Sequence, residues 1–173
     1  IRLSLVGSEM CIRDSLFESE QIELTASIEG SLPASSDDNR AREGMPDLDT
    51  LIEVGPQLVL TLKEREDIDS LSLKLPLRAV LSTDFSNLKY RGLLFQPRLS
   101  YSRDALFGTG ATGSVNVGPI FAADKLMDYF YDVPPEFATP TRPAFEARGG
   151  YMGMELTAGI TLSLIHISEP TRL

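Results

Sequence analysis

The segment Leu71–Ser82 alternates apolar and mostly polar side chains, and this period of two constrains the fold more than any other feature. Successive side chains of a β-strand point to opposite faces, so the alternation predicts a strand with one apolar and one polar face. The apolar face is rich in leucine, whereas the other face carries the cations Lys74 and Arg78. Such a strand fits between lipid on one side and a polar lumen on the other.

Five further segments alternate in the same way, and no stretch of comparable length keeps a helical period. Each is close to the ~9–11 residues that a tilted membrane strand needs. The sequence therefore predicts an all-β fold, an antiparallel transmembrane β-barrel fragment of about six up-and-down strands that form an incomplete barrel. The predicted strands are Ile22–Glu29, Ile52–Lys63, Leu71–Ser82, Leu93–Arg103, Val115–Phe121 and Gly150–Thr161.

Two local expectations accompany this pattern. Ala122–Tyr131 is the one segment expected to form a short helical turn. In the last predicted strand, Met152 is expected on the apolar face and Tyr151 on the polar face, because they fall on alternate positions.

The expected connections alternate in length. Glu64–Ser70 and Asp104–Thr112 are short, and Thr83–Gly92 is intermediate. The connections Ser31–Leu51 and Asp124–Gly149 are long. Outer-membrane barrels carry short turns on the periplasmic rim and longer loops on the other. The alternative is a soluble antiparallel barrel or sandwich, whose strands alternate in the same manner.

The composition bounds the class of protein. The 173 residues have the length of one domain, and no window holds the ~18 consecutive apolar residues of a spanning helix. The net charge of -9 argues against nucleic acid as a partner. No signal peptide is visible, so export requires that the natural start be missing.

The two ends of the chain can be encoded by one inverted DNA element. Leu5–Ser15 (LVGSEMCIRDS) can be back-translated into DNA whose reverse complement, after a shift of frame, reads as Leu162–Arg172 (LSLIHISEPTR). This relation is typical of transposase-type sequencing adapters translated in frame. We therefore expect residues 1–15 and 162–173 to be translated adapter, and residues 16–161 to be a partial β-barrel domain.

This boundary removes most catalytic chemistry. The only cysteine, Cys11, and the only histidine, His166, both lie in the expected adapter segments. Residues 16–161 therefore offer no disulfide, thiolate nucleophile, Ser-His-Asp triad or histidine-containing metal site. We expect a non-enzymatic chain with no catalytic residue, no cofactor and no metal.

Charged residues of both signs are expected on the polar faces of the strands. Small barrels fill their interior with side chains, so one interpretation is a network of ion pairs that plugs the lumen. The other interpretation is a pore lining that sets ion preference. The set comprises Glu23, Glu29, Glu53, Lys74, Arg78, Arg98 and Glu155.

The first long loop is acidic. Its carboxylates offer the oxygen ligands that Ca²⁺ and Mg²⁺ prefer, but their spacing lacks the pattern of an EF-hand loop. A solvated loop braced by Arg40 and Arg42 is the preferred interpretation. The acids are Asp37, Asp38, Asp47 and Asp49.

The last long loop is aromatic and rich in proline. Its aromatic residues fit a partner-binding patch, a membrane interface, or a loop folded over the barrel mouth. The prolines stiffen the segment and favour an ordered cap. Arg142 and Arg148 can pair with lipopolysaccharide phosphates or with neighbouring acids. The aromatic residues are Tyr129, Phe130, Tyr131, Phe137 and Phe145.

Two stretches resemble a known family. Ser36–Pro56 contains GMPDLD, followed by EVGP. Gly118–Gly153 contains DYFYDV and ATPTRPAFEARGGYMG. These motifs are similar to those of the MipA/OmpV family of Gram-negative outer-membrane proteins, and the resemblance covers essentially all of residues 16–161. They mark the family and are not catalytic signatures.

The resemblance implies a β-barrel in the bacterial outer membrane, made with a cleaved signal peptide. Members are described as scaffolds that bring a murein transglycosylase together with a murein synthase, and others are treated as porin-like. We therefore expect a scaffold surrounded by outer-membrane lipid and lipopolysaccharide, with murein enzymes as partners. The alternative is a narrow outer-membrane channel. Because a barrel must close to satisfy its backbone in lipid, this fragment is not expected to be a working barrel by itself.

Overall fold

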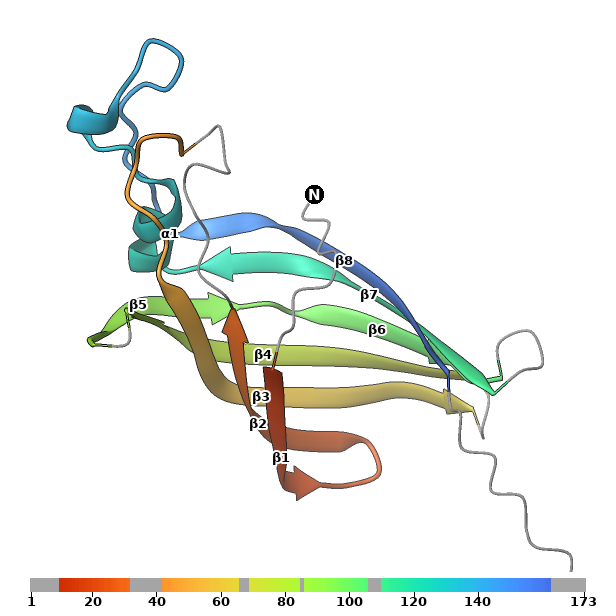
Figure 1. Ribbon diagram of the computed structural model, residues 1–173. Coiled ribbons are helices and arrows are strands. Elements are labelled where there is room, and N and C mark those ends of the chain that lie inside the picture. The colour runs from red at the N-terminus through yellow and green to blue at the C-terminus, as the bar shows by residue number, and fades with distance from the viewer. Residues whose placement is uncertain (1–9, 32–41, 66–68, 85, 106–109, 163–173) are drawn as a thin grey trace, which may run out of the picture.

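The computed structural model describes residues 10–31, 42–65, 69–84, 86–105 and 110–162 as one curved antiparallel sheet with helical segments at one end (Figure 1). The helix α1 (Asp124–Tyr131) and the 3-10 turn η2 (Pro135–Phe137) lie between the last two strands. The strands are β1 (Met10–Glu18), β2 (Ile22–Ser31), β3 (Thr50–Arg65), β4 (Asp69–Thr83), β5 (Leu88–Phe95), β6 (Arg98–Arg103), β7 (Ala111–Ala122) and β8 (Gly150–Leu162).

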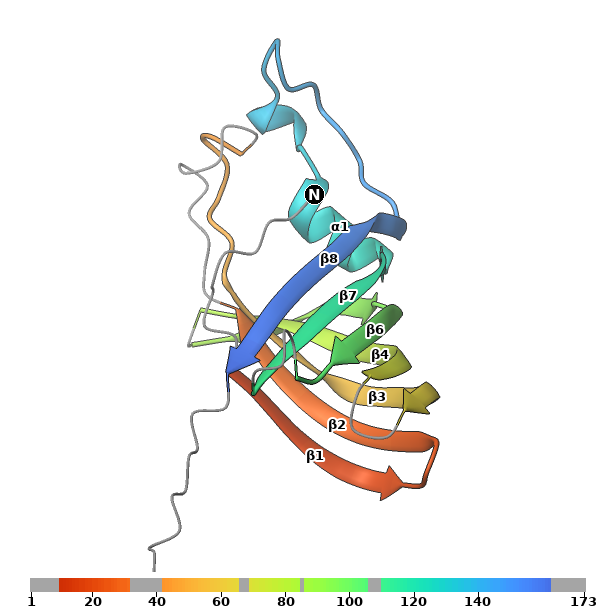
Figure 2. The same cartoon turned by 90° about the vertical axis from the view of Figure 1, so that its right-hand side faces the viewer.

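Neighbouring strands in the sheet are antiparallel and follow the chain order, except that β5 and β6 share one place between β4 and β7; this confirms the predicted all-β, up-and-down arrangement. β1 and β8 form the two edges within the described part of the chain, and the sheet curves between them (Figure 2). We call the end that carries α1 and the 42–49 segment the long-loop end. The opposite end, with the β1–β2 turn and the β6–β7 connection, is the short-turn end (Figure 1).

The predicted strand Leu93–Arg103 is wrong as a single element, because it divides at Gln96 and Pro97. β5 pairs with the second half of β4, and β6 pairs with the first half. Proline has no backbone N–H to donate to the ladder, so pairing stops at this point. The N–H of Gln96 reaches only the carbonyl oxygen of Pro76, at 3.4 Å.

The predicted intermediate connection Thr83–Gly92 is also wrong, because β5 already begins at Leu88. The turn between β4 and β5 is closed by Asp84, whose carboxylate accepts the backbone N–H groups of Ser86 (2.8 Å) and Asn87 (2.7 Å). These hydrogen bonds lower the pKa of the exposed Asp84 carboxyl. A further strand, β1, spans Met10–Glu18 and so reaches into the residues expected to be adapter.

The polar face of the sheet is buried, and the apolar face is exposed. Side chains on the concave, inner face are polar and buried: Arg78 is 2% exposed and Gln57 0%. On the outer face apolar side chains are exposed, and Leu77, the neighbour of Arg78, is 44% exposed. This difference confirms the alternation predicted for β4. The buried polar residues are Thr25, Ser27, Gln57, Arg78, Ser82 and Ser100.

A bulge in β8 corrects the predicted orientation of its first residues. The pairing with β7 shifts between Ile120 and Phe121, so Gly153 faces Ile120 while Tyr151 faces Phe121. The rings of Tyr151 and Phe121 lie 6.1 Å apart on the outer face. Met152, which was expected on the outer face, instead packs against a cluster of buried apolar residues at the long-loop end. One extra residue in a strand reverses the facing of every residue beyond it.

That buried apolar cluster lies at the long-loop end. α1 confirms the helical turn expected in Ala122–Tyr131, and its Leu126 is 1% exposed. Gly92, at a φ of +128°, lets the helix approach closely, since a Cβ at this position would lie 3.3 Å from the backbone nitrogen of Leu126. None of the helical segments described is long and apolar enough to cross a membrane. The cluster comprises Leu51, Val80, Leu94, Ala122 and Leu126.

Two glycines allow neighbouring strands to touch where they bend. A Cβ on Gly55 would lie 2.1 Å from the carbonyl oxygen of Leu77, and a Cβ on Gly118 would lie 1.9 Å from that of Pro97. Both contacts are with backbone, which cannot rotate away as a flexible side chain can. These positions therefore require glycine.

We predict that Gly55→Ala or Gly118→Ala lowers the free energy of unfolding by about 1–3 kcal/mol, the usual cost of overpacking. Gly153→Ala is the matched control, because its added Cβ meets nothing within 4 Å. The measurement is the urea midpoint of the folded chain. Equal midpoints for Gly55→Ala and Gly153→Ala would contradict the close approach.

Candidate functional site

The inner face of the sheet brings together charges from strands far apart in sequence. Glu29 on β2 and Glu53 on β3 are direct cross-strand partners. Like charges in this position repel, so a cation is needed between them. Arg78 on β4 supplies it: Nη1 and Nη2 donate to the two carboxylate oxygens of Glu29, and Nη1 lies 3.4 Å from Oε2 of Glu53. We call this group the Arg78 clamp.

The Arg78 clamp is buried unevenly. The side chain of Arg78 is 2% exposed, whereas those of Glu29 and Glu53 are 20% and 23% exposed. A bidentate guanidinium–carboxylate pair is a strong charge-assisted interaction with fixed geometry. Removing its cation would leave two carboxylates facing each other in a poorly hydrated place. The clamp therefore ties β2, β3 and β4 together from the inside.

A second ion pair repeats the local arrangement of the first. Val-Gly-Pro occurs at residues 54–56 on β3 and again at 117–119 on β7. Gly55 lies against the backbone of Arg78, and Gly118 lies against the backbone of Arg98. Arg98 then pairs with Glu155 on β8 at 3.7 Å. Each glycine thus makes room on the inner face where an arginine meets glutamate.

Of the remaining two predicted residues, only Lys74 lies beside one of these pairs. Lys74 on β4 is the cross-strand neighbour of Arg98 and is half-buried. Glu23 on β2 is half-buried and lies opposite Val59 of β3. The structure therefore gathers five of the seven predicted charges into two contacting groups. Whether the set plugs the lumen or lines a pore stays a prediction.

Several inner-face residues were not singled out from the sequence, although they lie on the predicted polar faces. Gln57 is fully buried, and its amide oxygen and nitrogen have no hydrogen-bond partner in the described part of the chain. The hydroxyl of Thr25 donates to the backbone carbonyl oxygen of Gln57 at 3.4 Å, so this bond does not involve the Gln57 side chain. Only their positions on the predicted polar faces indicated these residues, because a strand pattern does not distinguish a buried amide side chain from a solvated one.

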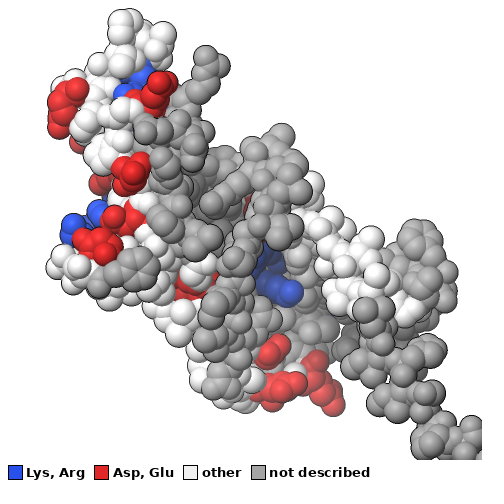
Figure 3. Space-filling view, in the orientation of Figure 1, with Lys and Arg blue, Asp and Glu red and all other residues white. Residues whose placement is uncertain are grey.

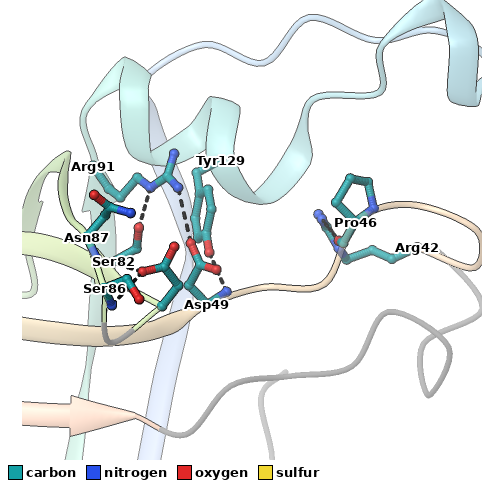
Figure 4. Close-up of polar contacts among 9 residues, drawn as sticks. Arg42, Pro46, Asp49, Ser82, Ser86, Asn87, Arg91 and Tyr129 are labelled. Carbon is teal, nitrogen blue, oxygen red and sulfur yellow. Dashed lines mark hydrogen bonds and ion pairs between the residues drawn. The ribbon is translucent and has the colours of Figure 1, made fainter.

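A second polar network links α1 to the strands at the long-loop end (Figure 4). The guanidinium of Arg91 donates to the hydroxyl of Ser82 at 2.8 Å and lies 3.4 Å from a carboxylate oxygen of Asp49. It also lies 4.0 Å from the ring centroid of Tyr129, in cation–π geometry. The phenol oxygen of Tyr129 accepts the backbone N–H of Asp49 at 2.7 Å. We call this group the Tyr129 latch.

Sequence reasoning missed Arg91 because it was assigned to a connection. The residue is extra in β5, where the pairing with β4 shifts between Val80 and Leu81. Gly92 beside it has a positive φ. A glycine inside a strand pattern is a known sign of a bulge and was the available signal.

Arg42 fastens the first long loop to the same helix. Its guanidinium donates to the carbonyl oxygen of Phe130 at 2.7 Å and to that of Pro46 at 3.2 Å. Burial lowers the pKa of Arg42. The predicted bracing of this loop is therefore confirmed for Arg42, through backbone carbonyls. Arg40, Asp37 and Asp38 lie outside the described residues.

Four of the five aromatic residues of the last long loop divide into two groups, and the fifth, Phe137, is half-buried. Tyr129 and Phe130 pack on the apolar cluster, with their rings 5.4 Å apart. Tyr131 and Phe145 are 44% and 58% exposed. The backbone of Phe145 pairs with Val133 through two hydrogen bonds, of 2.8 and 3.1 Å. This part of the loop is therefore ordered by its own backbone pairing, whereas a position over the barrel mouth stays a prediction.

Arg142 joins the two long loops, because its guanidinium donates to the carbonyl oxygens of Glu43 (3.0 Å) in the first and Phe137 (2.7 Å) in the last. Across the described residues, no group of three histidine, cysteine or acidic side chains is placed to hold a metal ion. On the face seen in Figure 3, the visible acidic side chains lie mainly at the long-loop end and beside the β1–β2 turn.

We predict that Arg78→Met lowers the free energy of unfolding by about 3–5 kcal/mol, because it strands Glu29 and Glu53 without a cation. Adding Glu29→Gln and Glu53→Gln to the same chain should recover part of the loss. Arg103→Met, at an exposed position, is the control and should stay within about 0.5 kcal/mol of wild type. Similar losses for both single variants, measured by urea unfolding, would refute the clamp.

We predict that the Tyr129 phenol ionises above the ~10 of a free tyrosine. Burial raises its pKa, while the hydrogen bond from Asp49 and the charge of Arg91 act in the opposite direction. The folded state therefore holds this proton more tightly than the unfolded state. The resulting stability is present below the unfolded pKa and is lost as the pH rises through the folded pKa.

The measurement is the ultraviolet absorbance of phenolate against pH, as the difference between wild type and Tyr129→Phe. Tyr131→Phe is the control, because Tyr131 is 44% exposed. A Tyr129 midpoint at or below that of Tyr131 would show that the latch does not bury the phenol.

The comparisons with known proteins identify a family. A family model described as MltA-interacting protein MipA matches residues 6–168. That range includes residues of both expected adapter segments. No curated protein and no solved structure matches the chain. Because the match covers nearly all of its residues, the chain belongs to the MltA-interacting protein MipA family.

Proposed function

We propose that the chain forms part of the wall of an outer-membrane β-barrel that acts as a non-enzymatic scaffold. The observation that carries the proposal is the inverted burial of the sheet, with Arg78 and Gln57 covered and large apolar side chains uncovered. A soluble antiparallel sheet packs its apolar face on a core and leaves the polar face to water. A membrane barrel does the reverse.

The outer face supports this proposal along the whole sheet. Exposed apolar side chains occur on every strand whose faces are described, from Ile28 on β2 (47%) to Leu156 on β8 (66%). Exposed apolar side chains on every neighbouring strand form a continuous surface, whereas the exposed hydrophobic residues of a soluble protein are scattered singly. By the usual habit of such barrels, the short-turn end faces the periplasm and the long-loop end faces outward.

The interior favours a filled barrel over an open channel. The Arg78 clamp occupies the inner face of three strands, and α1 packs its Leu126 inside the long-loop end. A narrow channel is the second candidate, because the inner face is polar. The channel predicts steady conductance in planar bilayers that Arg78→Ala and Glu53→Ala alter, whereas the scaffold predicts none.

The partner follows from the family rather than from a docking motif. The family is named for interaction with MltA. We propose a murein transglycosylase, together with a murein synthase, as partners at the short-turn end. Outer-membrane lipid and lipopolysaccharide would surround the barrel. Residues 1–15 and 162–173 remain, in this proposal, translated adapter that adds nothing to these contacts.

A charge placed on the outer face tests the membrane part of the proposal. Leu77→Arg lies near the middle of β4 and should cost about 2–4 kcal/mol in lipid. Leu88→Arg lies at the start of β5 and should cost only about 0–1 kcal/mol. The measurement is reversible unfolding from lipid bilayers. Equal costs at the two depths would mean that water, and not lipid, covers this face.

Crosslinking in intact cells tests the scaffold. A photo-reactive residue replaces Glu20, exposed in the β1–β2 turn, in the full-length protein. It should capture a murein transglycosylase or synthase. The same photo-reactive residue in place of Glu136, which is exposed at the long-loop end, is the matched control and should capture neither enzyme. Failure of Glu20 to capture either enzyme, or equal capture from both ends, would overturn the scaffold.

A further inference from the structure

A pocket of about 240 Å³ lies at the long-loop end, where the 42–49 segment meets α1 and η2. Most of its lining is apolar, although charged side chains also reach it. It shares Tyr129 with the Tyr129 latch. The lining includes Met45, Leu48, Asp128, Asp132, Pro134 and Phe137.

Two arginines fix the walls of this pocket relative to each other. Arg42, on one wall, donates to the carbonyl oxygen of Phe130 on the other at 2.7 Å. Arg142 donates to the carbonyl oxygens of Glu43 and Phe137, which also belong to the two different loops. The pocket is therefore held in shape by bonds within the chain, as ligand sites usually are before they bind.

Two carboxylates of the lining lie where a helix disfavours negative charge. Asp128 is in the last turn of α1, and Asp132 caps its C-terminus. The C-terminal end of a helix carries the negative pole of the helix dipole, and this last turn has no basic residue. The two acids are also four residues apart, a spacing at which like charges destabilise a helix. A cation between the two carboxylates would relieve both effects.

The described part of the chain does not supply that cation. Neither Asp128 nor Asp132 has an ion pair among the described residues, and Asp132 accepts only the backbone N–H of Ala147, at 2.6 Å. Arg42 lines the pocket, but it donates to carbonyl oxygens and lies in the field of Asp47. One arginine and three aspartates give the lining a net charge of -2. No three acids of the described residues are placed to hold a metal ion, so an organic cation fits better.

We propose that this pocket binds a small organic cation, a primary ammonium on a short apolar chain. The ammonium has three donors and bridges Asp128 and Asp132, because residues four apart on a helix have Cβ atoms ~5–6 Å from each other. The apolar chain lies against Met45, Leu48 and Phe137. The chain is short because pockets for drug-sized ligands begin at about 300 Å³. A free amine and the lysine side chain of a polypeptide share this chemistry.

The test titrates n-pentylamine into the full-length protein in neutral detergent micelles, by isothermal calorimetry with the signal of empty micelles subtracted. Its trimethylammonium analogue keeps the chain and the charge but has no donor, and pentanol has no charge. The amine should bind about tenfold more tightly than either, the effect of charge-assisted hydrogen bonds. Equal binding of the three, or binding of Mg²⁺ in place of the amine, would overturn the inference.

Charge-removing variants assign the binding to the two acids. Asp128→Asn and Asp132→Asn should each weaken n-pentylamine about tenfold, and asparagine keeps the oxygen that accepts the N–H of Ala147. Glu136→Gln removes an exposed acid of η2 and is the matched control, which should leave the affinity unchanged. An Nα-acetyl-lysine amide that binds as tightly as n-pentylamine assigns the site to a polypeptide lysine. Binding of n-pentylamine alone assigns it to a free amine.

The ligand-free protein gives a second, independent measurement. Asp128→Asn removes a like charge and loses no ion pair of the described chain, so its urea midpoint should equal or exceed that of wild type. A lower midpoint would mean that this carboxylate already has a partner, and the inference would fail. Neither measurement involves insertion into a bilayer, so such a failure would leave the proposed function standing.

Discussion

A β-strand presents successive side chains to opposite faces, and in this chain the polar residues fall on the covered face. The consequence is a sheet whose inner surface must be held together by polar contacts rather than by an apolar core. Arg78 meets this demand by bonding Glu29 and approaching Glu53, so three strands share one buried cation. A buried charge is tolerated only with partners of this kind. The apolar cluster is displaced to the long-loop end, where α1 covers it.

The strands themselves could be predicted because alternation is a local property of the sequence. The polar set of β2, β3 and β4 was correctly assigned to one face, and α1 was correctly located. The face predicted for Met152 was wrong, and Arg91, the extra residue in β5, was assigned to a connection. Both lie at bulges, and a bulge is defined by how two strands pair. A single strand pattern holds no information about the partner's register.

The charged site was predictable as a set but not as pairs. All seven residues lie on strands, yet only the three-dimensional order of β2, β3 and β4 decides that Arg78 meets Glu29. The Tyr129 latch shows the same limit in a stronger form, since Asp49 precedes β3, Arg91 lies at a bulge in β5 and Tyr129 lies in α1. The glycines at 55 and 118 show where neighbouring strands approach closely, and they recur with Val and Pro around them.

The central claim is that lipid covers one face of the sheet and not the other. The sequence has no tryptophan, so a single tryptophan can report its own surroundings. Leu156 and Thr157 are adjacent on β8 and face opposite ways, with Leu156 66% exposed on the outer face. In bilayers with brominated acyl chains, the fluorescence of Leu156→Trp should be strongly quenched and that of Thr157→Trp hardly affected. Equal quenching at the two positions, or none at Leu156→Trp, would contradict the account.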